Sequence, residues 1–191
     1  LQVFPDQAVI AVENVRLFPE LEARNREVTE ALEQQTATSD ILRVISGSPT
    51  DVTPVFEVMV EHARRLCDGV FANAVRFDGR VMRLMAQHGF GPEGLEMIRR
   101  AFPAPPDRGS MSGRAILAGS IVQVEDISVD AEATFSRELG AVMGFKAQVS
   151  GPLLKDGTPL GAITVARREP GPFPSRQIDL LRGLADQAAN A

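Results

Sequence analysis

Two Asp-Gly pairs, each between two strand-like segments, constrain the fold of this chain more than any other feature. Asp78-Gly79 joins residues 70–77 to 80–88, and Asp156-Gly157 joins residues 147–155 to 158–167. Asp-Gly favours a type I′ turn, whose two central residues have positive φ and which reverses the chain into an antiparallel hairpin. The sequence therefore predicts two β-hairpins and a fold that contains an antiparallel sheet.

Helical patterns precede, separate and follow these hairpins. Thr53-Pro54 is suited to starting a helix, and the apolar residues from Phe56 to Cys67 recur at helical spacing. Further helices are expected near residues 92–102, 110–117 and 130–143 and from about 175 to the end, and a strand is expected at 121–125. This mixture predicts an α+β fold with a central antiparallel β-sheet and helices on both faces.

A long N-terminal helix is predicted over residues 6–46. Leu21, Val28, Gln35 and Leu42 recur every seven residues, and Leu17, Ala31 and Ile45 fall on the interleaved seam. Such a seam is typical of a parallel coiled coil, so we expect a homodimer held by Leu17, Leu21, Val28, Leu42 and Ile45. Pro19 lacks a backbone donor and is expected to kink or break this helix.

The two ends of the chain resemble each other. Residues 1–11 and 181–191 share a leading Leu, an Asp-Gln-Ala run and a final Ala at a constant offset, since 186 − 6 = 180. That offset has the size of a whole domain. We therefore expect residues 1–18 to be the tail helix of a preceding similar module, 19–50 a coiled-coil connector and 51–191 the next module. A chance match between two short amphipathic helices is the alternative.

Composition excludes several classes of partner. The net charge of −5 and the pI near 5.1 do not favour nucleic-acid binding. No apolar run approaches the roughly 20 residues of a transmembrane helix, so no membrane insertion of this chain is expected. The single cysteine, Cys67, excludes an internal disulfide and suits the cytoplasm. His62 and His88 are too far apart in sequence for an i,i+4 metal-ligand pair.

Residues 53–191 resemble a GAF domain, the small-molecule sensing module of phytochromes, cyclic-nucleotide phosphodiesterases and bacterial sensor kinases. The matching segments are 65–67, 109–115, 121–126, 144–149, 152–157, 160–166, Phe173 and 180–185. Residues 29–43 also resemble the connector between tandem GAF modules in bacterial sensor histidine kinases and nucleotide cyclases. The resemblance implies the sheet order 2-1-5-4-3, with the terminal helices packed together on one face and a ligand pocket on the other.

By this resemblance the pocket lies under the helical insert, where methionine and phenylalanine would form an adaptable apolar lining. The expected lining is Met97, Phe102, Met111, Arg114, Val124, Asp126, Phe145 and Val149. Ordinary core packing explains the apolar members equally well. Arg99, Arg100, Arg108 and Arg114 form either an anion-binding rim or a solvated surface.

The ligand or cofactor is not identified by the sequence. Cys67 is on the wrong helix for attaching a bilin, and the signature of cyclic-nucleotide-binding GAF domains is missing. Sulfoxide reductases of the GAF type use several cysteines, whereas Cys67 stands alone on the apolar stripe of a helix. The sequence therefore does not favour an enzyme.

We therefore expect a non-catalytic sensory module of a cytoplasmic multidomain sensor histidine kinase, which binds a small ligand and transmits through its connector helices. The sensory module of a nucleotide cyclase is one alternative. A structural dimerisation spacer with a collapsed pocket is another. An open cavity with convergent polar groups would favour a sensor, and an interior filled with side chains would favour a spacer.

Overall fold

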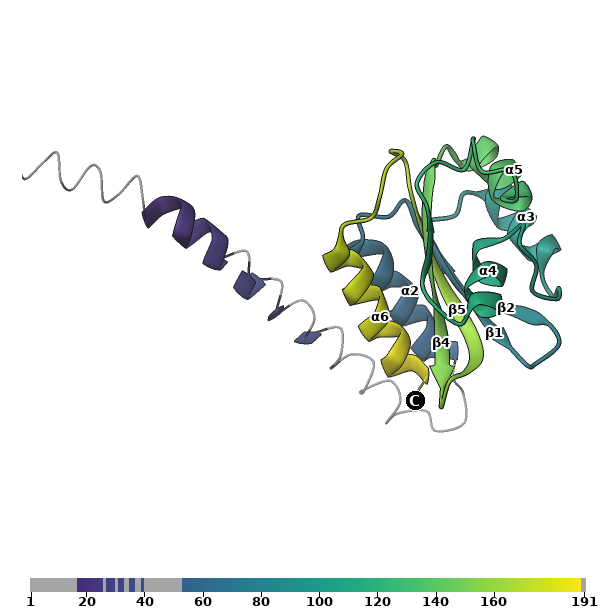
Figure 1. Cartoon of the computed structure of the whole chain (residues 1–191), viewed down its shortest axis with the longest axis horizontal. Coiled ribbons are helices and arrows are strands. Elements are labelled where there is room, and N and C mark those ends of the chain that lie inside the picture. Colours follow the sequence, from purple (N-terminus) through teal and green to yellow (C-terminus); the bar gives the residue numbers. More distant parts are fainter. Residues whose placement is uncertain are drawn as a thin grey trace, which may run out of the picture. The chain divides into compact units, whose positions relative to one another are not determined.

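The computed structural model describes residues 17–25, 27–29, 31–32, 35–36, 39 and 53–189 (Figure 1). The chain divides into two units, Leu1–Ala37 and Thr38–Ala191, and each is treated by itself. The described residues of the first unit are helical, and helical residues lie on both sides of Pro19, so the helix is not broken at this proline. Leu42, Ile45 and the predicted helix before residue 17 lie outside the described residues.

The second unit is built on a five-stranded sheet in the order β2-β1-β5-β4-β3. All neighbouring strands are antiparallel. The strands are β1 (Phe71–Phe77), β2 (Met82–His88), β3 (Val122–Val124), β4 (Ala147–Lys155) and β5 (Thr158–Arg167). The sheet confirms both predicted hairpins and the strand order that the resemblance implied.

The two Asp-Gly turns differ. Asp156 and Gly157 have φ of 50° and 77°, which confirms the predicted type I′ turn between β4 and β5. In the first hairpin, strand pairing ends at Phe77 and Met82, which leaves a four-residue loop. There the Asp78 carboxylate accepts hydrogen bonds from the backbone N–H groups of Arg80 and Val81, at 3.0 and 2.9 Å. The type I′ prediction is wrong for this turn because the Asp78 side chain organises a longer loop.

Helices cover both faces of the sheet (Figure 1). The pair α2 (Thr53–Leu66) and α6 (Ser175–Ala189) pack on each other and on one face. Three shorter helices, α3 (Pro92–Ala101), α4 (Met111–Ala118) and α5 (Thr134–Met143), cover the other face. Of these, α4 packs directly on β3, β4 and β5, while α3 and α5 pack against each other.

Strand alternation assigns each residue of the sheet to one face. The Ser150 hydroxyl is linked to α4 through Thr164, whereas a side chain on Gly151 would contact Leu181 of α6. Successive residues of a strand point to opposite faces. Gln148, Ser150 and Thr164 therefore belong to the face toward α4, here called the α4 face. Val149 belongs to the face toward α6, here called the α6 face.

The buried strand residues of the α6 face are all apolar. They include Ala72, Ala74, Val149, Leu153, Ile163 and Val165. Leu181 and Leu184 of α6 and Met59 and Val60 of α2 are buried as well. Burying a side chain such as Leu or Val stabilises a fold by roughly 1.5–3 kcal/mol, so this dry layer is the main structural core of the domain.

Candidate functional site

The α4 face carries a row of buried polar side chains through the middle of the sheet. Asn73, Ser150 and Thr164 are only 4, 0 and 2 % exposed. Register places Asn73 opposite Thr164, and Thr164 opposite Ser150, so the row crosses three neighbouring strands. Buried polar groups are destabilising unless they are hydrogen-bonded, so each of them needs a partner.

The hydroxyl groups of this row satisfy one another. The Ser150 hydroxyl donates to the carbonyl oxygen of Ile163 at 3.1 Å and lies 2.8 Å from the Thr164 hydroxyl. The Ser112 hydroxyl of α4 lies 2.9 Å from the same Thr164 oxygen. Since each hydroxyl has one proton, Thr164 donates to Ser150, and Ser112 donates to Thr164. This chain of hydrogen bonds ties α4 to the centre of the sheet.

Gln148 has no such arrangement. It is 3 % exposed, and its Oε1 atom has no hydrogen-bond partner within the described part of the chain. Its cross-strand neighbours on the α4 face are Val124 and Ala166, both apolar. A buried acceptor without a partner destabilises a fold by about 1–3 kcal/mol. The Oε1 atom of Gln148 is therefore an unsatisfied hydrogen-bond acceptor in an apolar environment.

The apolar surroundings of Gln148 form what we call the Met-Phe cluster. Its buried members are Phe71, Met111, Val124, Ile127, Leu139, Phe145 and Ala166, and the half-buried side chains packed against it include Phe90, Met97 and Met143. The Phe71 ring meets the Phe145 ring edge-on, with centroids 5.0 Å apart. The three methionines come from α3, α4 and α5. Because methionine is unbranched and flexible, this packing can rearrange more easily than an aliphatic core.

Local sequence fixes the start of α4 above the sheet. Ser110 caps the helix, with its hydroxyl accepting the N–H of Gly113 at 3.2 Å. The Asp107 carboxylate accepts the N–H groups of Gly109 and Ser110, both at 3.0 Å. A side chain at Gly113 would collide with the backbone of Asp107, so glycine is required there. This arrangement sets the position from which Met111 and Ser112 reach the sheet.

An ion pair closes the loops around α4. The Arg114 guanidinium makes two hydrogen bonds to the Asp130 carboxylate, at 2.7 and 2.8 Å, and its Nε donates to the carbonyl of Arg108 at 2.6 Å. The Arg114 and Asp130 side chains are 11 and 24 % exposed. The hydrogen bond from Arg114 lowers the pKa of Asp130 to about 2, so the carboxylate stays charged at neutral pH. The pair joins α4 to the segment before α5.

Most of the arginines considered for an anion-binding rim are already paired. Arg114 binds Asp130, Arg108 binds Glu132 at 2.8 Å, and Arg100 binds Glu96. These contacts favour the interpretation of a structural or solvated surface for the three side chains. Arg99 lies elsewhere, beside the sheet edge at β2.

The structure brings together four of the eight residues expected to line a pocket. Met111, Val124 and Phe145 belong to the Met-Phe cluster, and Met97 packs against it. The other four lie apart: Phe102 packs against a second cluster around Val75 and Met82, Arg114 pairs with Asp130, Asp126 accepts hydrogen bonds from Ser128, and Val149 is on the α6 face. Val149 is on the opposite side because it is adjacent in the strand to Ser150.

Five polar residues of this face were not singled out from the sequence: Asn73, Ser112, Gln148, Ser150 and Thr164. A signal was present. Each of the four strand residues is polar, has apolar or glycine neighbours on both sides, and lies in a segment predicted to be a strand. In a strand buried on both faces, packing alone favours apolar residues, so an isolated polar residue indicates that its position has another role.

His62 and Cys67 are buried side chains with potentially reactive groups. Cys67 is buried, and burial, followed by the nearby Asp68 charge, raises its pKa to about 12, so the sulfur remains a thiol. The buried His62 ring lies 3.0 Å from the Arg65 guanidinium. Within residues 17–39 and 53–189, as far as they are described, no group of three His, Cys, Asp or Glu side chains could hold a metal ion.

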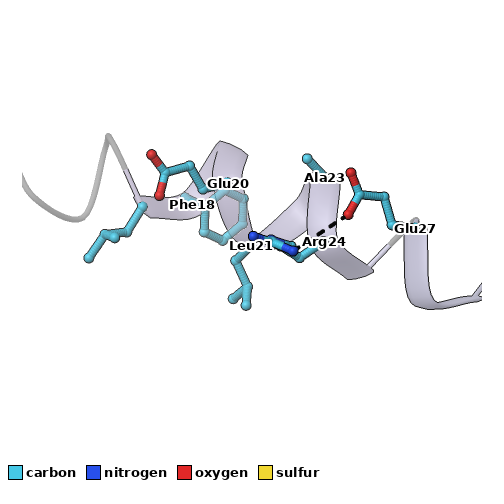
Figure 2. Close-up of a pocket in the computed structure, with 7 residues that line it drawn as sticks. Phe18, Glu20, Leu21, Ala23, Arg24 and Glu27 are labelled. Atoms are coloured by element: carbon cyan, nitrogen blue, oxygen red, sulfur yellow. Dashed lines mark ion pairs between the residues drawn. The ribbon is translucent and has the colours of Figure 1, made fainter.

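A hollow of about 1080 Å³ lies along the helix of the first unit and is not a ligand pocket (Figure 2). Its lining residues all come from residues 17–27, and their side chains are exposed. A single helix cannot enclose a ligand. The figure shows instead Phe18 and Leu21 projecting from this helix, with an ion pair from Arg24 to Glu27 at 3.9 Å.

The family of the second unit follows from its sequence and fold together. The model of the GAF domain family matches residues 49–191. This chain belongs to the GAF domain family. GAF domains are sensory and signalling modules, and the match covers all five strands and the helices α2 to α6.

Solved GAF structures share this fold. A domain of a two-component sensor histidine kinase protein from Sinorhizobium meliloti is 18 % identical, with a TM-score of 0.59 over 74 % of this chain and 90 % of that one. The GAF domain of a phosphoenolpyruvate-protein phosphotransferase from Coxiella burnetii is 15 % identical, with a TM-score of 0.67 over 84 % and 92 %. Free methionine-R-sulfoxide reductase from Neisseria meningitidis, in complex with its substrate, is 16 % identical, with a TM-score of 0.64 over 85 % and 89 %.

None of the curated proteins matches the chain. Among the described helices, including those of the GAF domain, none is long and apolar enough to cross a membrane.

Proposed function

We propose that this GAF domain is the sensory module of a cytoplasmic multidomain sensor histidine kinase, and that it binds a small ligand on the α4 face. The ligand is uncharged and mainly apolar, and it carries one hydrogen-bond donor. Binding alters the packing of the short helices and is transmitted through the connector helices to an output domain. Residues 1–18 are the tail helix of a preceding module, 19–50 the connector and 51–191 the sensory domain.

The unpartnered Oε1 atom of Gln148 carries this proposal. It is a buried acceptor on the face opposite the helix pair, flanked by Val124 and Ala166 of the Met-Phe cluster. A ligand with an N–H or O–H group would satisfy this oxygen, while its apolar body would replace contacts among methionine and phenylalanine side chains. Since small-molecule sites combine an apolar lining with a few polar groups, this chemistry defines a ligand class.

A structural dimerisation spacer is the alternative, and the filled interior is the observation that favours it. The Met-Phe cluster is packed by its own side chains. A spacer, however, gains nothing from a buried amide without a partner, because an apolar residue of similar size would be more stable there. The methionines also permit the rearrangement that ligand entry requires. We therefore prefer the sensor.

The kinase assignment rests on relatives and on the connector. One structural neighbour is a domain of a two-component sensor histidine kinase protein. Another neighbour is a sulfoxide reductase with its substrate, but Cys67 here is a buried thiol and does not supply a reactive thiolate. The sensory module of a nucleotide cyclase is the remaining alternative, and it uses the same ligand face and connector.

Transmission requires a dimer, and we propose that the connector forms it. Leu17 and Leu21 are 46 and 65 % exposed in the described helix, and Val28 is exposed as well. An exposed apolar strip at heptad spacing gains stability by pairing with a second copy. The proposed seam continues through Leu42 and Ile45. Connector helices paired in this way can shift between discrete arrangements.

Ligand binding is tested with the matched probes indole and indene, which differ in the N–H group. The proposal expects indole, and not indene, to raise the melting temperature of the whole chain and to shift NMR signals of the α4 face. Gln148→Met removes the acceptor at nearly constant volume and abolishes the indole effect. Val149→Ala, on the opposite face of the same strand, should destabilise the domain but leave the response to indole unchanged. An equal response to both probes would argue against a role for Gln148.

Dimerisation is tested by sedimentation of the whole chain. Leu21→Asp places a charge on the proposed seam and should convert the dimer to a monomer. Ala23→Asp places the same charge away from the seam and serves as the matched control. A monomeric parent chain at high concentration, or a dimer that survives Leu21→Asp, contradicts the proposed connector.

A further inference from the structure

A groove runs along the edge of the sheet at β2. It has a volume of about 470 Å³, within the range of small-ligand and peptide sites. Its floor is five consecutive residues of β2, from Arg83 to Gln87, one wall includes Glu57 of α2, and the other is formed by Arg99, Phe102 and Pro103 at the end of α3. We call it the β2 groove. It is separate from the Met-Phe cluster.

The floor of the β2 groove is an open strand edge. β2 is the last strand on its side of the sheet. The Met82 N–H donates to the carbonyl of Ala104 at 2.7 Å, and the Ala104 N–H donates back to Met82 at 3.2 Å. Met82 therefore directs its backbone groups outward. Since this direction alternates along an antiparallel strand, Leu84 presents its N–H and carbonyl outward as well, at the groove.

The charge around this edge is predominantly positive. Arg83 and Arg99 line the groove with a single carboxylate, that of Glu57. The nearest ion-pair partner of Arg83 is Asp78, at 3.8 Å, and both side chains are largely exposed, so this pair holds Arg83 only weakly. The groove thus differs in sign from the chain as a whole, which has a net charge of −5.

We propose that the β2 groove binds an extended acidic peptide, which adds to the sheet as a strand beside β2. Main-chain hydrogen bonds to the strand edge provide affinity, as in other cases of strand addition. Acidic side chains on one face of the peptide pair with Arg83, and those on its other face pair with Arg99, beside an apolar side chain that packs on Phe102. The partner is an extended acidic segment of another protein.

A second copy of this chain fits the groove less well than an acidic peptide. Pairing two β2 edges would bring the same positive side chains together, and like charges on neighbouring strands are destabilising. The β1–β2 ladder also contains an irregularity between Ala74 and Val75, with Met85 as the extra residue of β2. Bulges and charged residues at an edge discourage pairing between copies.

The probe is a fluorescent hexapeptide, Glu-Glu-Val-Glu-Glu-Val with blocked ends, which carries Glu on both faces of the strand; it is titrated with the whole chain and followed by anisotropy. We expect saturable binding that weakens with salt, because exposed charge pairs are screened. Arg83→Ala with Arg99→Ala should weaken binding about tenfold, because two exposed charge pairs are lost and each contributes modestly. Arg168→Ala, an exposed arginine outside the groove, is the matched control and should change nothing.

Strand addition is separated from simple charge attraction by a second peptide, identical except that alternate backbone amides are N-methylated. This peptide keeps the charge and loses the donors that a strand needs, so it should not bind. Protection of the Leu84 amide from hydrogen exchange should accompany binding of the unmethylated peptide only. Equal binding of both peptides, unchanged affinity in the double arginine variant, or self-association of the chain in place of peptide binding would each overturn the proposal. Unfolding curves of the variants verify that they are folded.

Discussion

The two faces of the sheet are buried to a similar degree, yet they differ in chemistry and in the way they are covered. The buried strand side chains of the α6 face are Ala, Val, Leu and Ile, under two long helices that pack on each other. The α4 face contains Asn73, Gln148, Ser150 and Thr164 under three short helices joined by loops. Ion pairs such as Arg114–Asp130 hold those loops together.

This difference separates stability from responsiveness within one sheet. An apolar layer against long helices resists change because every rearrangement opens a cavity. A layer built from hydroxyl chains, methionines and short helices has alternative arrangements of similar energy. Because both layers share the same strands, we propose that a change on the α4 face is transmitted to the helix pair through the sheet.

The largest effect is expected from the α6 face. Leu181 is fully buried between α6 and the sheet. Leu181→Ala should lower the free energy of unfolding by about 3–4 kcal/mol through lost burial and the cavity left behind. Urea denaturation followed by circular dichroism measures this loss. Met97→Ala, at a half-buried position on the α4 side, is the comparison and should have less than half the effect. Equal losses would remove the distinction between the two faces.

A pair of isosteric swaps at neighbouring positions tests the difference in polarity. Thr164→Val removes the hydroxyl that Ser112 and Ser150 share and should cost about 2 kcal/mol, because two buried hydroxyls lose a partner. Val165→Thr places a hydroxyl on the apolar α6 face and should cost about 1–3 kcal/mol. Both are measured by urea denaturation. If Thr164→Val were neutral, the hydroxyl chain would not hold α4 in place.

The ion pair around α4 predicts a smaller, pH-dependent effect. The pKa of Asp130 is lowered in the folded state to about 2, below the value near 3.9 of an unfolded chain. Its contribution to stability is therefore present above about pH 4 and is lost as the pH falls toward 2. At pH 7, Asp130→Asn should cost about 1 kcal/mol, since solvent partly screens the pair. The difference between the two proteins should shrink as the pH falls through this range and vanish only below pH 2.

Asp179→Asn is the control for this titration, because Asp179 pairs with Arg182 on an exposed helix surface. At every pH between 2 and 7, the unfolding free energy of Asp179→Asn should be nearly the same as that of the parent protein. A gap between Asp130→Asn and the parent protein that stays constant down to pH 2 would show that the carboxylate charge is not what stabilises the loops.

The fold could be predicted from the sequence because its signals are local. Asp156-Gly157 has the conformation that its residue types favour, and the strands around it begin and end where the apolar pattern does. The Asp78-Gly79 turn shows the limit, since a side-chain hydrogen bond from Asp78 competes with the intrinsic turn preference. The residue types predicted that a hairpin forms, and the hydrogen bonds of the Asp78 carboxylate determine the length and conformation of its loop.

The candidate site was less predictable because it depends on which side of a strand each residue occupies. Val149 and Gln148 are adjacent in sequence, and an error of one residue exchanges the two faces. In a strand buried on both sides, apolar residues occupy both faces, so the usual alternation that identifies the outer side is missing. The tertiary contacts of Ser150, through Thr164 to Ser112 of α4, and of Gly151 with Leu181 of α6 identify the two faces.

The smallest effect is expected at Gln148, and its sign is the opposite of the others. Its Oε1 atom is buried without a partner, so replacing the amide by the thioether of methionine removes an unsatisfied group at nearly constant volume. Gln148→Met should therefore raise the unfolding free energy of the ligand-free chain by up to about 1 kcal/mol. Thr164→Val, one strand away on the same face, lowers it because that hydroxyl has partners. Differential scanning calorimetry of the parent and both variants measures whether each substitution raises or lowers the unfolding free energy. A destabilised Gln148→Met protein would mean that the amide has a stabilising partner in solution, and Gln148 would then not be an open acceptor for a ligand.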